Sequence, residues 1–429
     1  MKITKANGKT EYELVKKIKN RSSEADPKIT EIVTSIIKDV KENGDQSLKE
    51  YTSRFDGVVP KKFCIERDEL HSYLDVVDED FKTALIDARN NIYDFHQRQA
   101  QQSWLTTKEN GVIMGQRIRG LHRVGIYVPG GTAAYPSSVL MNAVPAKIAG
   151  VGEIVMVTPP SKTGEPNPNI MAAAAIAGVD RVFLCGGAQA VAALAYGTET
   201  VPKVDKIVGP GNIFVATAKK LLYGVVDIDM IAGPSEILIV ADKTARPHFL
   251  AADLMSQAEH DKMASAILLT TSESLAKATL KEVQRQLWFL DRREIIEESL
   301  ENYGDIIVCE DLEQAIHFAN ELAPEHLELC VDEPLKYIGM IDNAGSVFLG
   351  NWSPEPLGDY FAGPNHVLPT GGTARFFSPL SVDSFVKKSS FIYYTSDELK
   401  KAKDEIITLA ETEGLTAHAN SLKIRFEYE

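Results

Sequence analysis

Four residues of this sequence are candidate metal ligands, namely Gln257, His260, Asp359 and His418. Gln257 and His260 stand three residues apart in the segment SQAEHD, so on a helix both side chains project to one face and could share a cation. Asp359 in PLGDYF and His418 in LTAHANS offer a carboxylate and a second imidazole from distant parts of the chain. Glutamine is an uncommon zinc ligand, however, and a lone helical histidine is more often structural. The spacing alone therefore leaves a metal site and a structural interpretation open.

Glu325 and His326 are an adjacent carboxylate and imidazole in the segment APEHLEL. Such a pair can divide two proton transfers if the fold directs both side chains into one cleft. Neighbours on a regular helix or strand diverge, which favours one buried and one solvated residue instead. A helix that starts after Pro324 would remove this objection.

Three glycine-rich turns suit the binding of a phosphate group. Each follows an apolar run and precedes a helical one, and they are Pro129-Gly130-Gly131, Gly186-Gly187 and Gly209-Pro210-Gly211. Beyond the carboxyl ends of parallel strands, such turns present backbone N–H groups to an anion such as a dinucleotide pyrophosphate. None of the three completes the GxGxxG pattern, and glycine at a tight strand-to-helix turn is common without a ligand. Nucleotide binding and a purely structural role both remain open at this point.

The four cysteines lie far apart and form no CxxC pair, at Cys64, Cys185, Cys309 and Cys330. This spacing disfavours both a disulfide framework and a thiolate zinc site. Cys330 in HLELC could be imagined as a nucleophile, but no matched motif surrounds it. We expect reduced, mostly buried thiols and assign none of them to catalysis.

Alternating strands and helices must position these groups. From residue 124 onward, short apolar runs that end in Gly or Pro alternate with helical stretches, a pattern typical of parallel sheets. The first four pairs are 124–131 with 137–150, 153–160 with 169–178, 181–188 with 190–197, and 205–211 with 212–224. A second set has strands at 236–242, 266–271, 305–310 and 346–350, separated by helices through 253–260, 280–288 and 313–323. Two α/β lobes follow from this pattern.

The rest of the chain does not show this alternation of strands and helices. Residues 26–101 read as helical, with Ile29, Val33 and Ile36 on one face, and the chain from Ser396 is charged and helical. The Gly- and Pro-rich segment 352–378 reads as a long functional loop. We therefore predict an α/β fold of two Rossmann-like lobes with parallel sheets, plus small helical segments at the N- and C-terminal ends.

Composition excludes several classes of function. A chain of 429 residues exceeds what one hydrophobic core usually supports, so two or more domains are expected. The net charge of -14 argues against non-specific binding to nucleic acid. The N-terminus has no secretory pattern, and the longest apolar stretch, residues 170–179, is too short to span a bilayer. We expect a cytoplasmic protein that binds neither nucleic acid nor a membrane.

The ordered set of motifs resembles the histidinol dehydrogenase family over about residues 26–425. The most specific segments are YVPGG, GGAQAVAALAYGT, VGPGN, AGPSE, SQAEH, PEHLEL, LGDYFAGPNHVLPTGGTAR and LTAHANS. The resemblance implies the NAD-dependent, four-electron oxidation of L-histidinol to L-histidine through L-histidinaldehyde, the last two steps of histidine biosynthesis. It also implies one Zn²⁺ per subunit, bound by the side chains of Gln257, His260, Asp359 and His418.

Roles for the other residues follow from the same resemblance. His326 is implied as the base for the alcohol proton, and Glu325 as the group that activates water against the aldehyde. The substrate contacts implied are the four zinc ligands, His326, Ser235, His366 and Glu413. The NAD contacts implied are Tyr127, Gln189 and Asn212, which lie on or beside the glycine-rich turns.

The resemblance also implies a homodimer with shared active sites, in which the C-terminal tail carries Glu413 and His418 into the partner's site. With the strand pattern, it predicts four parts of the chain. These are an N-terminal helical segment (1–25), a first lobe with the metal and catalytic residues (26–123 and 237–381), a second, NAD-binding lobe (124–236), and a helical tail exchanged across the dimer (382–429).

Two other functions compete with this prediction. A zinc-dependent hydrolase on a two-lobed α/β scaffold would turn over without NAD, and its glycine-rich turns would be purely structural. A non-catalytic binding protein for a small polar ligand would keep its ligand and show no turnover at all. The placement of Tyr127, Gln189 and Asn212 at strand-to-helix turns argues against the hydrolase.

Overall fold

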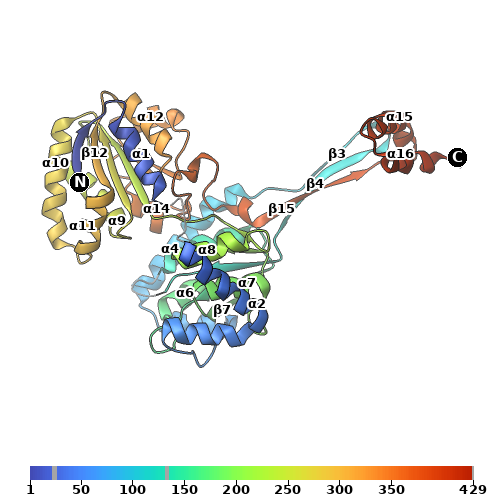
Figure 1. Ribbon diagram of the computed structural model, residues 1–429, viewed down its shortest axis with the longest axis horizontal. Helices are drawn as coiled ribbons and strands as arrows, with labels where there is room; N and C mark the ends of the chain where they lie inside the picture. The colour runs from blue at the N-terminus through green and yellow to red at the C-terminus, as the bar shows by residue number, and fades with distance from the viewer. Residues whose placement is uncertain (22–26, 131–134, 428–429) are drawn as a thin grey trace. The chain divides into compact units, whose positions relative to one another are not determined.

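The computed structural model describes residues 1–21, 27–130 and 135–427 (Figure 1). Their contacts define two compact units, Met1–Gln99 with Leu121–Phe385 and Ala100–Gly120 with Val386–Glu429. We call these the main unit and the tail unit and describe each by itself. The predicted turn residue Gly131 and the predicted boundary between residues 25 and 26 lie outside the described residues.

The first sheet of the main unit, the β5 sheet, contains the four strand–helix pairs predicted first. Its strand order is β2-β7-β6-β5-β8-β9, and all neighbours are parallel except at the β2 edge. The strands are β2 (Cys64–Glu66), β5 (Arg123–Tyr127), β6 (Glu153–Thr158), β7 (Arg181–Leu184), β8 (Lys206–Val208) and β9 (Asp227–Ile228). The helices are α5 (Pro136–Ile148), α6 (Pro168–Ala177), α7 (Gly187–Tyr196) and α8 (Ile213–Leu222). Helices cover the sheet, so its strands are apolar runs rather than alternating ones.

The second sheet of the main unit, the β10 sheet, is entirely parallel, with the order β1-β12-β11-β10-β13-β14. The strands are β1 (Lys2–Lys5), β10 (Glu236–Ala241), β11 (Ser265–Thr270), β12 (Gly304–Val308), β13 (His326–Cys330) and β14 (Ser346–Leu349). Alternate residues of β10 face opposite layers of helices. Ile237 and Ile239 pack in the layer of α9 (Pro247–Ala258), α10 (Glu273–Gln286) and α11 (Arg293–Tyr303). Leu238 and Val240 pack in that of α1 (Thr10–Asn20) and α12 (Leu312–Leu322).

Two strands of the β10 sheet were not predicted from the sequence. The segment after Pro324 is not the start of a helix, because His326 opens β13 and pairs with β10 and β14. The N-terminal segment is not helical throughout, because Lys2–Lys5 adds β1 to the edge of the sheet beside β12. β1 (KITK) and β13 (HLELC) contain charged or polar residues, so no apolar run marks either strand in the sequence. A pairing partner far along the chain decides their structure.

The helices of residues 27–99 pack on the β5 sheet. These helices are α2 (Pro27–Asp56), α3 (Arg67–Ser72) and α4 (Glu79–His96). The apolar face of α2, with Val33, Ile36 and Leu48, shares a core with α7 and α8, and α4 contacts α5. This packing differs from the predicted grouping of 26–123 with 237–381, because helical spacing identifies an apolar face but not its partner.

The tail unit consists of an antiparallel sheet and two helices. Its strand order is β15-β4-β3, with β15 at Val386–Tyr393, β4 at Ile113–Gly120 and β3 at Trp104–Thr107. The helices are α15 (Ser396–Thr412) and α16 (Thr416–Lys423), so the predicted helix from Ser396 is confirmed, while β15 was not predicted. Several large apolar side chains of this unit are exposed, including Leu105, Ile392 and Leu409.

Among the described residues, no helix has both the length and the apolar character that crossing a bilayer requires.

Candidate functional site

The predicted catalytic residues lie at the amino edge of the β10 sheet. Glu325 directly precedes β13, Ser235 directly precedes β10, and Gln257 lies in the last turn of α9, which leads into β11. Asp359 lies in α14 (Glu355–Tyr360), the short helix that follows β14. Parallel sheets usually bind ligands at their carboxyl edge, so this placement is the reverse of the common arrangement.

The side chains of Glu325 and His326 both form hydrogen bonds with the main chain of Glu236, the first residue of β10. The Glu236 N–H donates to Glu325 Oε2 over 2.8 Å, and the Glu236 carbonyl lies 2.9 Å from His326 Nδ1. Both side chains therefore turn toward the same residue, although neighbours in a regular strand diverge. This is possible because Glu325 stands just outside the strand that His326 begins.

The hydrogen bond to Glu236 defines the tautomer of His326. A carbonyl oxygen only accepts, so Nδ1 carries the proton and Nε2 is the basic nitrogen. Burial lowers the pKa of His326 to about 4, which keeps the ring neutral at physiological pH. Within the described chain, no hydrogen-bond partner reaches the buried Nε2. The ring thus presents an available base.

Glu325 is a carboxyl group with an unusual environment. Burial first, and next the charge of Glu236, raise its pKa well above the ordinary value. The bond from the Glu236 N–H opposes this rise because it stabilises the carboxylate. A carboxylate of raised pKa is a stronger base than a solvated one.

Two carboxyl groups of α14 face the basic nitrogen of His326. His326 Nε2 lies 3.9 Å from Glu355 Oε1 and 3.9 Å from Asp359 Oδ1. Ligand atoms of these three residues lie within 4.8 Å of one another, a spacing suited to a metal ion. Burial raises the pKa of Asp359 to about 6, and burial together with the charge of Asp359 raises the pKa of Glu355 to about 9.

The predicted zinc ligands of the main unit lie around this cluster. Gln257 is buried, and no partner within the described residues satisfies its Oε1. Ser256 donates to Glu355 Oε2 over 3.3 Å, which connects the end of α9 to α14. Burial, followed by the charges of Arg292 and His366, lowers the pKa of His260 and keeps it in the neutral form that binds metals. Buried acceptors of this kind are costly unless a cation or donor satisfies them, so the donor set fits a bound metal.

His366 and Ser235 complete the predicted site within the main unit. His366 Nδ1 lies 3.0 Å from the Asp359 carbonyl, and its Nε2 lies 3.3 Å from the Ser138 hydroxyl of α5. Burial lowers the pKa of His366 to about 4. Ser235 is half-buried beside β10, and its carbonyl accepts from the N–H of Ser265.

Two predicted site residues belong to the tail unit. Glu413 caps the end of α15 and His418 lies in α16, both with exposed side chains. Their exposure leaves both groups available to a ligand or to another chain.

The predicted NAD residues lie at the carboxyl edge of the β5 sheet. Strand order reverses between β5 and β8, and ligands commonly bind at such a switch point. Tyr127 ends β5, and its hydroxyl accepts from the Gly187 N–H over 3.0 Å. Asn212 is exposed and caps α8 through Oδ1, which accepts from the N–H groups of Phe214 and Val215. Gln189 is buried in α7, and no described residue bonds to its Oε1.

One turn glycine has a structural reason that needs no ligand. Gly209 has a φ of +109°, and a Cβ there would lie 2.2 Å from the Tyr127 carbonyl oxygen. The carboxyl ends of β5 and β8 can approach each other only because this residue has no side chain.

Sequence reasoning missed two residues of this site. Glu355 stands four residues before Asp359 in α14, a helical spacing that could have indicated it. The N–H of Glu355 donates to Glu328 Oε1 over 2.9 Å, which fixes α14 to β13. Glu236 acts through its main-chain N–H and carbonyl groups, and the type of residue in the sequence gives no indication of such a role.

The cysteines take no part in this cluster. All four are free thiols in the described chain, and Cys64 is the one that is half-buried rather than buried. Cys330 ends β13, at the opposite end of the strand from His326, and burial raises its pKa. This confirms the expectation of reduced, mostly buried thiols.

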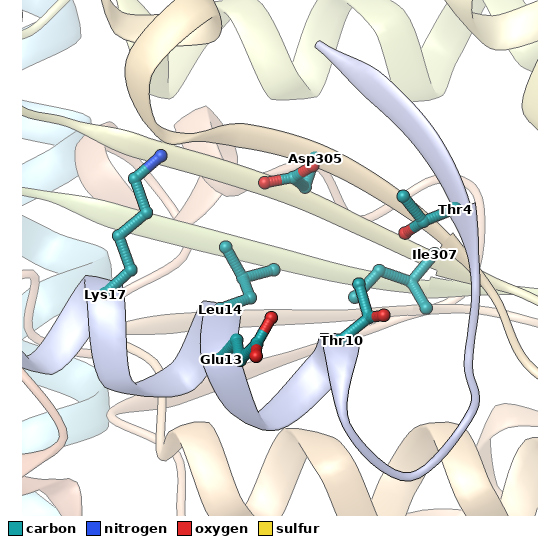
Figure 2. A pocket seen from close by; sticks show the side chains of 7 residues that line it. All are labelled: Thr4, Thr10, Glu13, Leu14, Lys17, Asp305 and Ile307. Atoms are coloured by element: carbon teal, nitrogen blue, oxygen red, sulfur yellow. The ribbon is translucent and has the colours of Figure 1, made fainter.

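A cavity of about 180 Å³ lies elsewhere in the main unit, between β1, α1 and β12 (Figure 2). Its lining combines polar and aliphatic side chains, those of Thr4, Thr10, Glu13, Leu14, Lys17, Asp305 and Ile307. The cavity shares no lining residue with the cluster around His326, and its lining contains no imidazole. We therefore locate the chemistry at the amino edge of the β10 sheet.

Fold and site together define a class of protein. It is a two-lobed α/β enzyme in which a buried carboxyl–imidazole pair stands beside groups able to hold a cation.

Comparison with known proteins gives the family. The family described as histidinol dehydrogenase matches residues 19–426. The chain is 58% identical to a histidinol dehydrogenase of Clostridium acetobutylicum over 410 residues, 96% of this chain and 95% of that protein. It is 54% identical to one of Lactococcus lactis subsp. lactis, with 98% of each chain covered. Against the crystal structure of histidinol dehydrogenase from Elizabethkingia anophelis, the TM-score is 0.93 at 38% identity, covering 100% of this chain and 98% of that one.

The chain therefore belongs to the histidinol dehydrogenase family, a family of oxidoreductases. This confirms the predicted family and the α/β fold of two lobes with parallel sheets. The hydrolase and the binding protein are not favoured.

Proposed function

We propose that this protein catalyses the NAD-dependent, four-electron oxidation of L-histidinol to L-histidine through L-histidinaldehyde. The observation that carries the proposal is the buried basic nitrogen of His326, which lies 3.9 Å from Glu355 Oε1 and from Asp359 Oδ1. Oxidation of an alcohol needs a base for the hydroxyl proton, and a neutral imidazole is suited to that role.

In the first oxidation, His326 Nε2 accepts the hydroxyl proton of the alcohol. The low pKa of the ring keeps Nε2 unprotonated before the reaction. The bond from Nδ1 to the Glu236 carbonyl fixes the orientation of the ring and becomes stronger when the ring is charged. Glu236 thus supports the transient imidazolium.

In the second oxidation, Glu325 accepts a proton from the water that adds to the aldehyde. Its Oε2 is bound by the Glu236 N–H, so we assign Oε1 to the water. The raised pKa of Glu325 makes its carboxylate a better base for this step. The hydrated aldehyde can then lose a second hydride.

NAD, when bound, supplies the hydride acceptor for both oxidations. We assign its site to the switch point of the β5 sheet, with Tyr127, Gln189 and Asn212 as contacts. The buried Oε1 of Gln189 is free to accept from a cofactor amide or hydroxyl, since no described residue donates to it. The tyrosine hydroxyl fixes the Gly187 turn and thereby shapes this edge.

Zinc, when bound, supplies a positive charge that anchors the imidazole and amine of the substrate. We assign one ion per subunit to Gln257, His260 and Asp359, with His418 from a second copy of the chain as the fourth ligand. His326 also belongs to the geometric cluster with Asp359. We assign its Nε2 to proton transfer instead, because a nitrogen that coordinates a metal cannot accept a proton. Ser235, His366 and Glu413 are the further substrate contacts that we propose.

A homodimer completes the site in this proposal. Glu413 and His418 are exposed in the tail unit, together with apolar side chains such as Ile392 (70% exposed) and Leu409 (66% exposed). Exposed apolar groups of this number are typical of a surface that another chain covers. We propose that the tail exchanges across the dimer and carries both residues into the second copy's active site.

The cytoplasm is the compartment that we propose for this function. Four free cysteines are typical of a reducing environment.

The test is the yield of reduced nicotinamide per L-histidinol consumed, measured on protein stripped with a chelator and then restored with zinc. Two equivalents that depend on zinc are the expected result. One equivalent with release of aldehyde would contradict the role of Glu325. No turnover in the restored sample would contradict the proposed function.

A further inference from the structure

A buried ion pair lies directly behind the catalytic pair. Arg21, which follows α1, places Nη2 2.8 Å from Glu236 Oε1, and the two side chains are 0% and 2% exposed. The same guanidinium also donates to the carbonyl of Pro234 over 3.3 Å and to that of Met263. Arg21 therefore connects the end of α1 to the segments before β10 and β11.

The residue that Arg21 binds is the one that orients both catalytic groups. The main chain of Glu236 donates to Glu325 Oε2 over 2.8 Å and accepts from His326 Nδ1 over 2.9 Å. The side chain of Glu236 points to Arg21, while its main chain serves the catalytic pair. A shift of Glu236 would misalign both groups at once.

Stability alone does not explain this pair. Removing two charges from water is costly, and well-packed apolar residues of similar volume are often equally or more stable. A planar guanidinium that binds a carboxylate and two carbonyls does fix geometry, however. We propose that Arg21 is a positioning residue for the catalytic pair: it anchors Glu236, whose main chain holds Glu325 and His326 in line. This inference rests on the proposed function for its kinetic readout.

Charge supports the same role. Glu236 and Glu325 are neighbouring buried carboxyl groups, and the Glu236 charge is among the causes that raise the pKa of Glu325. Arg21 provides the opposite charge to both of them. Without it, two buried carboxyl groups would face each other with their nearest counter-charge removed.

The test compares Arg21→Met, Arg21→Lys and the double variant Arg21→Met/Glu236→Gln as purified, zinc-loaded enzymes. We expect Arg21→Met to lower kcat for L-histidinol at least tenfold while KM stays within twofold, because Arg21 bonds to Pro234, Glu236 and Met263 and not to the proposed zinc ligands that anchor the substrate. Arg21→Lys should recover part of kcat. The double variant should be more stable to heat than Arg21→Met, because it also removes the Glu236 carboxylate that Arg21→Met leaves buried without its ion-pair partner.

Arg181→Met is the matched control, since Arg181 pairs with Glu153 in the β5 sheet, through Nε to Oε1 at 2.9 Å. It should lower thermal stability and leave kcat unchanged. Hydrogen–deuterium exchange at residues 235–241 gives a readout independent of turnover, and it should be faster in Arg21→Met than in wild type or Arg181→Met.

Unchanged kcat in folded Arg21→Met, or an equal loss in Arg181→Met, would overturn the inference. If the wild-type protein does not oxidise L-histidinol, the proposed function is wrong. Hydrogen–deuterium exchange alone then tests whether Arg21 positions the catalytic pair. Faster exchange at residues 235–241 would still support positioning by Arg21, and unchanged exchange would overturn it.

Discussion

His326 donates its Nδ1 proton to the main-chain carbonyl of Glu236 over 2.9 Å, and this contact determines which nitrogen can act as a base. The carbonyl belongs to the first residue of β10, so the position of the ring depends on the pairing of two parallel strands. The amino edge of the β10 sheet thus provides both the base and the support for its orientation.

We predict that Glu355 contributes to metal binding, although it is not among the ligands predicted from the sequence. We expect Glu355→Gln to weaken zinc binding about tenfold, within the range typical of residues that support metal ligands. The physical reason is that a bound cation would favour the ionised form of Glu355, whose pKa burial raises to about 9 without a metal, and a glutamine cannot supply that charge. Competition with a chelator measures the affinity. Glu333→Gln, at an exposed glutamate, is the control. Equal affinity in both variants would refute this role.

His96 makes the stability of the protein depend on pH. Its ring is fully buried, with Nδ1 2.7 Å from Gln99 Oε1, and burial lowers its pKa below the ordinary 6.5. Protons then bind the unfolded chain more strongly than the folded one. The contribution of His96 to the free energy of unfolding is therefore fully present above about pH 6.5. It is lost as the pH falls below that value, by at most about 1.4 kcal/mol per pH unit.

The measurement is the free energy of unfolding from pH 8 to pH 5 in wild type and in His96→Asn. The difference between the two isolates His96, because His326 and His366 titrate in both proteins. A constant difference across this range would show that His96 is not the group responsible.

Gly209 holds the carboxyl ends of β5 and β8 together. We expect Gly209→Ala to cost roughly 3 kcal/mol or more of stability, because a left-handed backbone and a clash with the Tyr127 carbonyl combine. The KM for NAD should rise as the switch point widens. Gly224→Ala is the control, since Gly224 has a φ of +98° with no described atom within 4 Å of an added Cβ. It should cost only about 1–2 kcal/mol. Equal losses of stability in Gly209→Ala and Gly224→Ala would mean that the close approach of Gly209 to the Tyr127 carbonyl does not affect stability.

The exposed face of β15 should be required for dimer formation. Ile392→Lys changes a side chain that is 70% exposed, so the fold of one chain should tolerate it. We expect monomers in sedimentation and a loss of activity, because each site would lack Glu413 and His418 from the second copy. Val76→Lys, at a side chain that is 68% exposed in the main unit, should stay dimeric and active. An active Ile392→Lys monomer would exclude a shared site.

The sheets could be predicted well from sequence because their strands are apolar runs between glycine or proline turns. The run from Glu236 to Ala241 is one example, and it forms β10 as expected. β13 could not be predicted, because its charged start resembles the first turn of a helix after Pro324. Its pairing with β10 and β14 decides the structure, and these contacts are distant in sequence.

Some residues of the candidate site could also be identified from the sequence, and others could not. Residues with a reactive side chain, such as His326 and Asp359, were identified by type and by family resemblance. Glu236 was not, because it acts through its N–H and carbonyl groups, which every residue except proline has. The helices of residues 27–99 were recognised but grouped with the other lobe, since an apolar face does not identify its partner.

The division of work between His326 and Glu325 is the central claim, and one comparison tests it most directly. The rate of nicotinamide reduction by His326→Asn is measured with L-histidinol and, separately, with added L-histidinaldehyde. We predict that oxidation of the alcohol falls about 10²- to 10⁴-fold, as expected for loss of a general base, while oxidation of the aldehyde is retained to a much greater extent. If His326→Asn oxidised the alcohol at the wild-type rate, or lost activity equally with the alcohol and the aldehyde, the proposed roles of His326 and Glu325 would be contradicted.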